Sequence, residues 1–232
     1  MKNNSIVDYL GHKKYPGRTI CFSVNEDKSL GSIIYFIMGR SENSQNRIFV
    51  QEGNVIKTKA YDESKVTDPS LIIYPVYKEI GDYKILTNGD QTQTIYEGLE
   101  NGLVPSQALL SRDFEPDAPN FTPRISLSVN KEGYELNIIK ANDEEGTASC
   151  HFNYLFPFKG GVGHCIHTYV DDGTPLPSFE GEPFRFSHED GLRDKIWEAI
   201  NPEFKISLVE VKIDLVKNEV KDVVIINKHE VR

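Results

Sequence analysis

Two arginines stand at the ends of one loop that is rich in serine and asparagine, Arg40 and Arg47. A third, Arg18, opens an apolar run near the N-terminus. The guanidinium fork matches the oxygens of a phosphate group, so a pair of arginines around one loop could clamp a phosphorylated small molecule. The alternative is that these arginines are solvated and bind nothing, as is common for surface arginines.

A second polar group stands where a helix is expected to begin. Asn88 and Gly89 lead into residues 90–100, whose apolar spacing predicts a helix. The free N–H groups at a helix N-terminus attract anions, and Thr92 would stand beside them. The alternative is that Asp90 or Thr92 only caps the helix.

A loop over residues 113–125 combines carboxylic acids, aromatic residues, prolines and an arginine. Proline fixes its backbone angle φ, which stiffens the loop and holds the side chains within it. Glu115 in such a loop, near Arg124, could act as a positioned acid or base, or accept from the hydroxyl groups of a ribose. The alternative is a rigid surface connection with a local ion pair.

Histidine and cysteine gather in a glycine-rich segment of the second half of the chain. Cys165 and His167 would share one face of a strand, with Cys150 and His151 nearby in the sequence. Zinc sites use paired motifs such as Cys-x-x-Cys or His-Glu-x-x-His, and the sequence has neither, so we predict no metal and no other cofactor. His167 could face a ligand together with Tyr169, or it could be a buried structural histidine.

The elements that must position these residues are mostly strands. Short apolar runs alternate with turns rich in glycine, asparagine and aspartate, which is typical of successive β-hairpins. Near the C-terminus Val209, Val211 and Ile213 alternate with charged residues, so one face of that strand is expected to be buried and the other to face water. The predicted pairs are 19–24 with 32–38, 47–51 with 54–57, 71–77 with 83–86, 122–129 with 134–139, and 205–216 with 220–227.

Helices are few, and the clearest is predicted over residues 188–200. An apolar residue recurs there at every fourth position, and Ser187 followed by Asp190 resembles a capping box. Residues 105–112 could form a short helix beside 90–100. Hairpins with a few helices outside them predict an α+β fold with largely antiparallel sheets, and not alternating βαβ units.

The composition is that of an ordinary globular protein. The chain has 232 residues, a net charge of −9 and 38% apolar residues. Acidity without a basic run argues against a nucleic-acid partner, and no apolar run is long enough to span a membrane. Three cysteines predict the reducing cytoplasm and not a disulfide scaffold. We expect one domain, residues 15–232, after a polar leader, residues 1–14, that packs loosely or caps a sheet edge.

Five segments carry a family resemblance when they are taken in order. They are Tyr15-Pro16-Gly17-Arg18, Asn46-Arg47, Asp68-Pro69 with Tyr74, the run Thr87–Ile95, and an acidic loop with Glu115 that ends in Thr122-Pro123-Arg124-Ile125. Together they resemble the archaeal-type inosine-monophosphate (IMP) cyclohydrolase family and its bacterial relatives. The resemblance covers residues 15–130, with a weaker extension to Pro183. The chain departs from the archaeal form in its leader, in a longer Arg40–Arg47 loop and in its C-terminal third.

This resemblance implies a fold and an activity. The fold would be the four-layer αββα arrangement of the N-terminal-nucleophile hydrolases. The activity would be closure of 5-formamidoimidazole-4-carboxamide ribonucleotide (FAICAR) to IMP with loss of water, in de novo purine synthesis. Cleavage of the chain to expose a nucleophile is not expected in this family.

The resemblance also suggests residue roles. The carboxamide nitrogen must attack the formyl carbon of the same molecule, so an enzyme has to bring two groups together, help remove a proton and stabilise an oxyanion. We expect Tyr74 to donate to the formyl oxygen or relay a proton, Glu115 to act as base or orient the amide, and Arg47 to lie nearest the chemistry or the phosphate. Arg124 would fix Glu115 or Asp117. Substrate contacts are expected from Arg18, Arg40, Asn88, Thr92, Arg124 and His167.

Two other functions stay open. An amide hydrolase of the same architecture would need Thr19 or Cys21 as a new N-terminus after cleavage, which the intact mass would reveal. A non-catalytic purine-nucleotide-binding protein would bind IMP or its precursor without turnover, which an ultraviolet assay of ring closure would reveal. The exposed strand edges of a hairpin-rich fold favour a homo-oligomer, of a size that the sequence does not fix.

Overall fold

The structure is a computed structural model that describes residues 4–66 and 73–230. In these ranges the chain forms a six-stranded and a seven-stranded sheet, and every named pair of neighbouring strands is antiparallel. The prediction of an α+β fold with largely antiparallel sheets and few helices is therefore confirmed.

The six-stranded sheet combines strands from both ends of the chain. Its strands are β1 (Thr19–Val24), β2 (Leu30–Met38), β10 (Val162–His167), β11 (Phe184–Ser187), β12 (Lys205–Asp214) and β13 (Glu219–Asn227). They lie in the order β11-β10-β1-β2-β12-β13, so β2 is an interior strand between β1 and β12.

The seven-stranded sheet is a meander in which every strand pairs with the next one along the chain. Its strands are β3 (Ile48–Glu52), β4 (Val55–Lys59), β5 (Pro75–Ile80), β6 (Tyr83–Thr87), β7 (Arg124–Val129), β8 (Gly133–Ala141) and β9 (Ser149–Pro157).

All five predicted hairpins are confirmed, since antiparallel ladders join β1 to β2, β3 to β4, β5 to β6, β7 to β8 and β12 to β13. Residues 71 and 72 of the strand expected at 71–77, and the pair Asp68-Pro69, lie outside the described residues. The predicted pairs do not include β9, although Cys150, Phe152, Tyr154 and Phe156 alternate along it with mostly polar residues, and Tyr154 and Phe156 pack partly against the core between the sheets.

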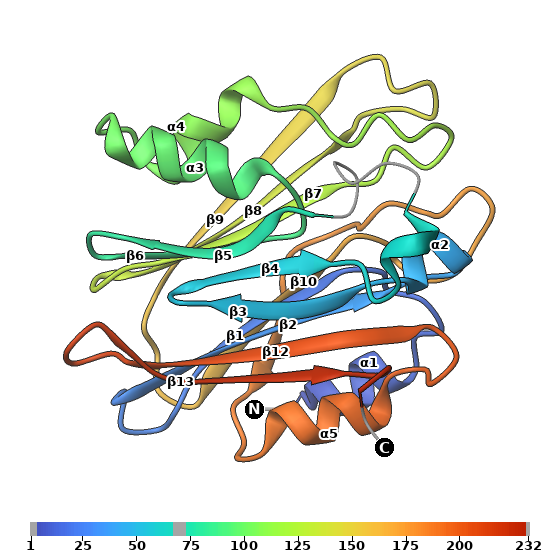
Figure 1. Cartoon of the computed structure of the whole chain (residues 1–232). Coiled ribbons are helices and arrows are strands. Elements are labelled where there is room, and N and C mark those ends of the chain that lie inside the picture. Colours follow the sequence, from blue (N-terminus) through green and yellow to red (C-terminus); the bar gives the residue numbers. More distant parts are fainter. Residues whose placement is uncertain (1–3, 67–72, 231–232) are drawn as a thin grey trace.

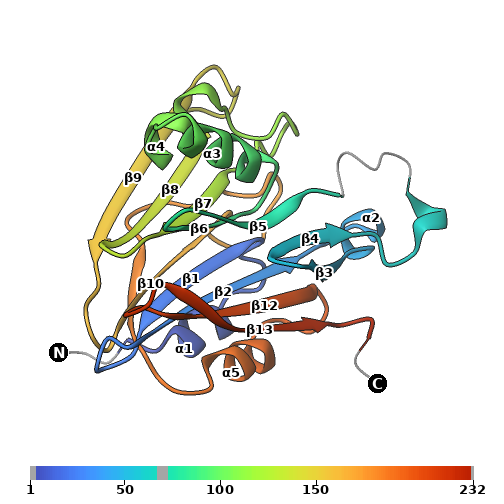
Figure 2. The ribbon, with the colours of Figure 1, turned by 60° about the vertical axis from the view of Figure 1, so that its left-hand side comes forward.

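One apolar core lies between the two sheets. On β2 the alternate residues Ile33, Tyr35 and Ile37 belong to it, and on β7 so do Ile125 and Leu127. Alternation along a strand sends these side chains to one face, and their burial removes apolar surface from water. The two sheets are therefore packed face to face (Figures 1 and 2).

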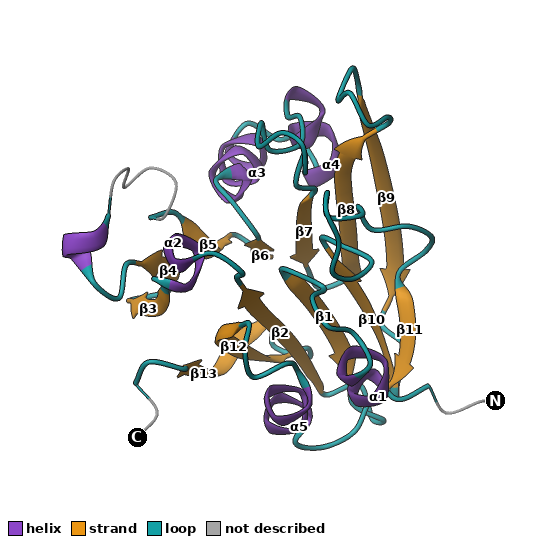
Figure 3. Ribbon diagram, turned by 90° about the vertical axis from the view of Figure 1, so that its right-hand side faces the viewer, coloured by secondary structure: helices purple, strands orange, loops and turns teal. Residues whose placement is uncertain are grey.

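A second core lies on the other face of the six-stranded sheet, beneath α1 (Ile6–Gly11) and α5 (Leu192–Ala199). The two helices contact each other and stand on the same side of that sheet (Figure 3). Ile6 and Leu10 of α1 are fully buried. The expectation of a loosely packed leader is therefore wrong for α1, because its apolar face completes this core; residues 1–3 lie outside the described residues.

The start of the C-terminal helix also differs from the prediction. Ser187 belongs to β11, where it pairs with Val162, and it does not cap the helix. The residue before α5 is Gly191, with a φ of +72° that favours glycine. The predicted stripe is correct, since Leu192 and Ile196 are buried in the second core.

The alternation along β12 is only partly confirmed. Its residue Glu210 was expected to face water, yet it is 6% exposed. It accepts a hydrogen bond of 2.8 Å from Ser32 on the neighbouring strand, and Arg193 of α5 lies 3.6 Å away. The outer face of β12 is covered here because α5 packs against it.

The outer face of the seven-stranded sheet carries α3 (Gln91–Glu100) and α4 (Pro105–Ala108), the second followed by a 3₁₀ turn, Leu109–Ser111. Ile85, Ile95 and Leu109 form a small core between them. The helices predicted at 90–100 and 105–112 are thus confirmed. A short helix α2 (Glu42–Gln45) and a 3₁₀ turn, Glu63–Lys65, lie in loops. Within the described residues no helix combines the length and apolarity that a membrane crossing requires.

Candidate active site

A cavity of about 480 Å³ lies where several strands begin at one edge of the molecule. Its lining comes from the residues just before β1, β3 and β5, from the turn between β6 and α3, and from the loop that enters β7. It is lined by Arg18, Asn43, Arg47, Tyr74, Asn88, Gly89, Asp90, Glu115, Pro116, Asp117, Thr122 and Arg124. The structure therefore brings together Arg18, Arg47, Tyr74, Asn88, Glu115 and Arg124 of the predicted set.

Arg18 is placed by a tight backbone contact. Gly17 has a φ of +75°, and a Cβ atom there would stand 2.2 Å from Oγ1 of Thr168 and 2.6 Å from the ring of Tyr169. The backbone carbonyl of Arg18 accepts from the N–H of Thr168 at 2.9 Å. Glycine lets the chain come this close, so the opening Tyr-x-Gly-Arg segment has a structural reason.

Arg40 and Arg47 do not form the predicted clamp. The guanidinium of Arg40 binds the carboxylate of Asp172 at 2.7 Å and the carbonyl of Gly173 at 2.8 Å, away from the cavity lining. The loop between the arginines folds as α2, whose N-cap Ser41 carries a capping box. Arg18, not Arg40, is the second cation beside Arg47.

Arg18 and Arg47 form no ion pair with any residue in 4–66 or 73–230. Arg47 is only 9% exposed, and its Nε has no hydrogen-bond partner among the described residues. Burial lowers the pKa of Arg47, yet arginine keeps its charge at neutral pH. Two such cations give the cavity a positive potential that favours an anionic ligand.

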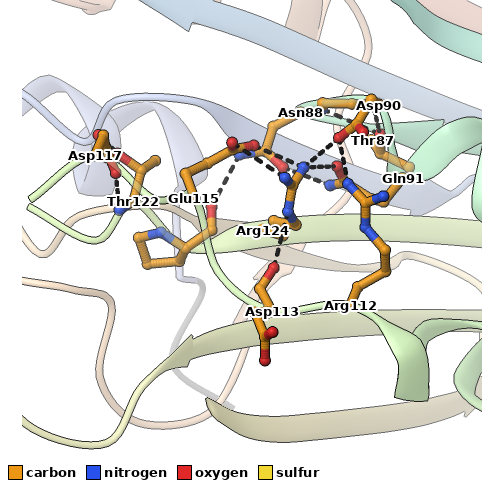
Figure 4. Close-up of polar contacts among 12 residues, drawn as sticks. Thr87, Asn88, Asp90, Gln91, Arg112, Asp113, Glu115, Asp117, Thr122 and Arg124 are labelled. Carbon is orange, nitrogen blue, oxygen red and sulfur yellow. Dashed lines mark hydrogen bonds and ion pairs between the residues drawn. The ribbon is translucent and has the colours of Figure 1, made fainter. Parts of the chain in front are cut away.

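Arg124 has the opposite surroundings (Figure 4). Its guanidinium lies 2.6 Å from Asp90, 2.7 Å from Glu115 and 2.9 Å from Oε1 of Gln91, and its Nε donates to the carbonyl of Asp113 at 2.9 Å. The prediction that Arg124 fixes Glu115 is confirmed. This arginine joins the helix start, the acidic loop and the first residue of β7 into one rigid wall of the cavity.

Glu115 faces the cavity as a half-buried carboxyl group. The pKa of its carboxyl group is raised, chiefly because burial disfavours the charged form. The positive charges of Arg124 and Arg18 lower this pKa, and the negative charge of Asp90 raises it. Its backbone N–H donates to the carbonyl of Thr122 at 2.9 Å, which closes the loop. A carboxylate with a raised pKa is suited to take up a proton near neutral pH.

Asp117 is held by Thr122 and not by Arg124, the partner that the sequence suggested. It accepts from the backbone N–H of Thr122 at 2.6 Å and from the Thr122 hydroxyl at 2.5 Å. That hydroxyl also lies 2.5 Å from the phenol of Tyr169. Asp117, Thr122 and Asn43 also line the cavity but were not predicted as site residues. The sequence signal for the first two was their place in one proline-stiffened loop, whose last segment, from Thr122, carries part of the family resemblance.

Asn88 and Thr92 shape the turn into α3. Asn88 lines the cavity, but its amide donates to the carbonyl of Pro123 at 2.9 Å and its Oδ1 accepts from Ile125 N–H at 2.8 Å. Thr92 is fully buried, and its hydroxyl lies 2.7 Å from that of Thr87, so Thr92 does not line the cavity. Both side chains therefore hydrogen-bond to the backbone of the protein, Asn88 to Pro123 and Ile125, and Thr92 to the carbonyl of Gly89.

His167 is a buried histidine whose two ring nitrogens are satisfied. One nitrogen lies 2.7 Å from the phenol of Tyr9 and the other 2.6 Å from the carbonyl of Tyr169. Burial lowers its pKa to about 3, so the ring is neutral. His167 does not line the cavity, so in this structure it is the buried structural histidine that the sequence left as the alternative.

Two further sequence hypotheses concern buried residues. Within the described ranges, no three side chains of the histidine, cysteine, aspartate or glutamate type gather as a metal site. Thr19 and Cys21, the alternative nucleophiles, lie inside β1 and are 0% and 1% exposed. Neither side chain reaches solvent in the folded chain.

The fold and cavity define an α+β protein with a cationic, phenolic and carboxylate-lined site suited to an anionic small molecule. The chain belongs to the family described as IMP cyclohydrolase-like protein, whose model matches residues 15–218. The match extends well beyond residue 130 and includes most of the C-terminal third, where the sequence alone gave only a weak resemblance.

Relatives named IMP cyclohydrolase are similar over most of their length. The one from Methanopyrus kandleri is 31% identical over 188 residues, which is 72% of this chain and 89% of the relative. The one from Methanothrix thermoacetophila is 31% identical over 171 residues, 72% of this chain and 80% of the relative. A third, from Methanococcus maripaludis, is 29% identical over 140 residues, 58% of this chain and 65% of the relative.

Proposed function

We propose that this chain is an IMP cyclohydrolase, which closes FAICAR to IMP with loss of water in purine nucleotide synthesis. The observation that carries the proposal is the cavity itself. Arg18 and Arg47 line it without a carboxylate partner among the described residues, beside Tyr74 and Glu115. The names of the similar archaeal proteins support the same reaction.

The phosphate of the substrate would bind to the cationic side of the cavity. Arg18 and Arg47 offer guanidinium groups that no described carboxylate neutralises, and a phosphate would receive charge-assisted hydrogen bonds from them. Arg124 is already engaged by Asp90 and Glu115, so its part is to hold the opposite wall. We assign supporting roles to Arg40, Thr92 and His167, which lie off the lining.

The reaction is intramolecular, so orientation supplies much of the rate. The carboxamide nitrogen forms a bond to the formyl carbon, and the formyl oxygen takes up a proton to give a ring-closed hydroxyl intermediate. That hydroxyl then leaves as water while the former formamide nitrogen gives up its proton. An enzyme that holds the carboxamide and formyl groups close together lowers the entropic part of the barrier to ring closure.

Glu115 and Tyr74 would move the protons. The raised pKa of Glu115 suits it to accept the carboxamide proton, and Arg124 keeps its carboxylate in place. Tyr74 would donate to the formyl oxygen as negative charge develops there. Arg47, next to this phenol in the lining, would stabilise the same developing charge or hold the phosphate.

The finer fold assignment is part of the same proposal. We assign the chain to the four-layer αββα arrangement of the N-terminal-nucleophile hydrolases, as one domain that includes α1 together with residues 15–232. The support is that α1 and α5 cover one sheet, α3 and α4 cover the other, and an apolar core fills the space between. The free state of its three cysteines supports a cytoplasmic location.

The direct test is to incubate the purified protein with FAICAR and follow IMP by its ultraviolet absorbance. We expect ring closure in the wild type, and a fall in turnover of about 10² to 10⁴-fold in both Y74F and E115Q, with little change in the free energy of unfolding. Y83F and E132Q, at residues that do not line the cavity, serve as matched controls.

Each contrary result has a specific meaning. Full turnover in both variants would remove the roles of Tyr74 and Glu115. Binding of IMP without ring closure would make the chain a nucleotide-binding protein. A mass corresponding to a chain that begins at Thr19 or Cys21 would instead support an amide hydrolase.

A further inference from the structure

The phenol of Tyr35 is a buried polar group that the proposed reaction does not use. Tyr35 is 0% exposed, and its hydroxyl has no hydrogen-bond partner in the part of the chain that the structure describes. A buried hydroxyl without a partner costs about 1–3 kcal/mol of stability. Phenylalanine would fill the same space without that cost, so the hydroxyl calls for an explanation.

Strand register places this phenol near both cationic residues of the cavity. Tyr35 on β2 pairs with Ile20 on β1, two residues after Arg18. Its ring packs 5.5 Å from that of Phe49, two residues after Arg47. Tyr74, Arg18 and Arg47 are the groups whose charge acts on the Tyr35 phenol. The hydroxyl thus lies beneath the cationic side of the cavity.

Arg47 offers the matching unsatisfied donor. Its Nε is buried and, among the described residues, has no acceptor. A phenolic oxygen can accept from a guanidinium N–H, and hydrogen bonds to charged groups contribute about 1.5–3 kcal/mol. The two atoms are thus a donor and an acceptor that are both buried and, among the described residues, without a partner, on residues whose charges act on each other.

We propose that Tyr35 is a positioning residue: its hydroxyl accepts from Nε–H of Arg47 when the anionic substrate engages the terminal nitrogens of that guanidinium. The hydrogen bond fixes the plane of the fork, so that both terminal N–H groups face the anion. This inference rests on the proposed function, because it assigns Tyr35 to the site that we propose for FAICAR.

Tyr77 provides a matched control in the same protein. It is 1% exposed and lies in the core between the sheets, and its hydroxyl likewise has no hydrogen-bond partner among the described residues. It stands on β5, and the group that acts on its hydroxyl is the carboxylate of Glu79, which is near it without meeting hydrogen-bond geometry, and not an arginine of the cavity. Removal of either hydroxyl leaves a similar core.

The test compares Y35F with Y77F. Both variants are expected to unfold at the same or a higher urea concentration than the wild type, since each loses a buried unsatisfied hydroxyl. Y35F is expected to lower kcat/KM for FAICAR about tenfold, the effect of one charge-assisted hydrogen bond, while Y77F keeps the wild-type value. Equal kinetics in the two variants would overturn the proposal.

A double-mutant cycle separates positioning from a general effect on packing. Arg47→Lys keeps the positive charge but lacks the Nε–H donor and the fork. If Tyr35 acts through Arg47, then Y35F has no further effect on kcat/KM in the R47K background. A tenfold fall from Y35F in both backgrounds would mean that Tyr35 does not act through Arg47.

Failure of the proposed function would be visible separately. If the wild type forms no IMP from FAICAR, that function is wrong, and calorimetric titration with IMP and with inorganic phosphate then tests Tyr35. Weaker anion binding by Y35F than by Y77F would support the positioning role. Equal affinities of the two variants, or no binding of either probe to the wild type, would overturn it.

Discussion

Arg47 and Arg124 are both less than one-tenth exposed, yet their surroundings predict opposite effects of the same substitution. Arg47→Met removes a buried cation that has no ion pair among the described residues, so we expect the free energy of unfolding to rise by about 1 kcal/mol. The same variant should raise KM for FAICAR strongly, because the anion loses a partner. Urea unfolding and initial rates measure the two effects.

Arg124→Met is the contrasting variant. It leaves Asp90 and Glu115 without their shared partner, so we expect a loss of about 3 kcal/mol in the free energy of unfolding. Activity should fall as well, since Glu115 is no longer held. If R47M proved as destabilising as R124M, then Arg47 would be a structural residue and the anion site would be misplaced.

The sequence located site residues best where they lie in loops with distinctive chemistry. Arg18, Tyr74 and Glu115 could be named because their neighbours form recognisable segments. The prediction that Arg40 lines the site was wrong, because its partners Asp172 and Gly173 lie far along the chain and the loop after it folds as α2, neither of which the sequence indicates. Tyr35 could not be found at all, since a tyrosine in an apolar strand is indistinguishable from a core residue until the register is known.

At the scale of elements, the N-terminal helix α1 is the part of the fold that the sequence described least well. The helix itself is short, and the polar residues before and after it hide that Ile6 and Leu10 share one face and complete the core under α5. Turn signals, by contrast, located the five predicted hairpins, but not the one that joins β8 to β9 across Asn142 to Ala148. β9 was missed although Cys150, Phe152, Tyr154 and Phe156 mark an apolar face on it.

This packing of α1 can be measured. Leu10→Ala removes a fully buried side chain, so we expect a loss of about 2–5 kcal/mol in the free energy of unfolding. Val7→Ala, on a half-buried position of the same helix, should cost much less. Turnover of the folded L10A protein should match the wild type, because α1 does not line the cavity. An unchanged stability of L10A would mean that α1 is not part of the folded core.

At the scale of the whole molecule, two buried histidines make stability depend on pH. Burial lowers the pKa of His164 to about 4 and that of His167 to about 3, whereas an unfolded histidine titrates near pH 6.5. Between these values the unfolded chain binds protons that the folded chain does not, so stability falls as the pH is lowered. At pH 5 each histidine should cost about 2 kcal/mol relative to neutral pH.

Urea unfolding at pH 7 and pH 5 tests this linkage. The variant H167Q removes one of these two buried histidines, so its loss of stability between pH 7 and pH 5 should be about 2 kcal/mol smaller than that of the wild type. H229Q, which replaces an exposed histidine that stacks on Tyr61, is the control for the exchange of histidine for glutamine itself. A free energy of unfolding that stays constant over this range would show that the two rings are not held neutral by the fold. The core that carries them would then be more open to water than their burial indicates.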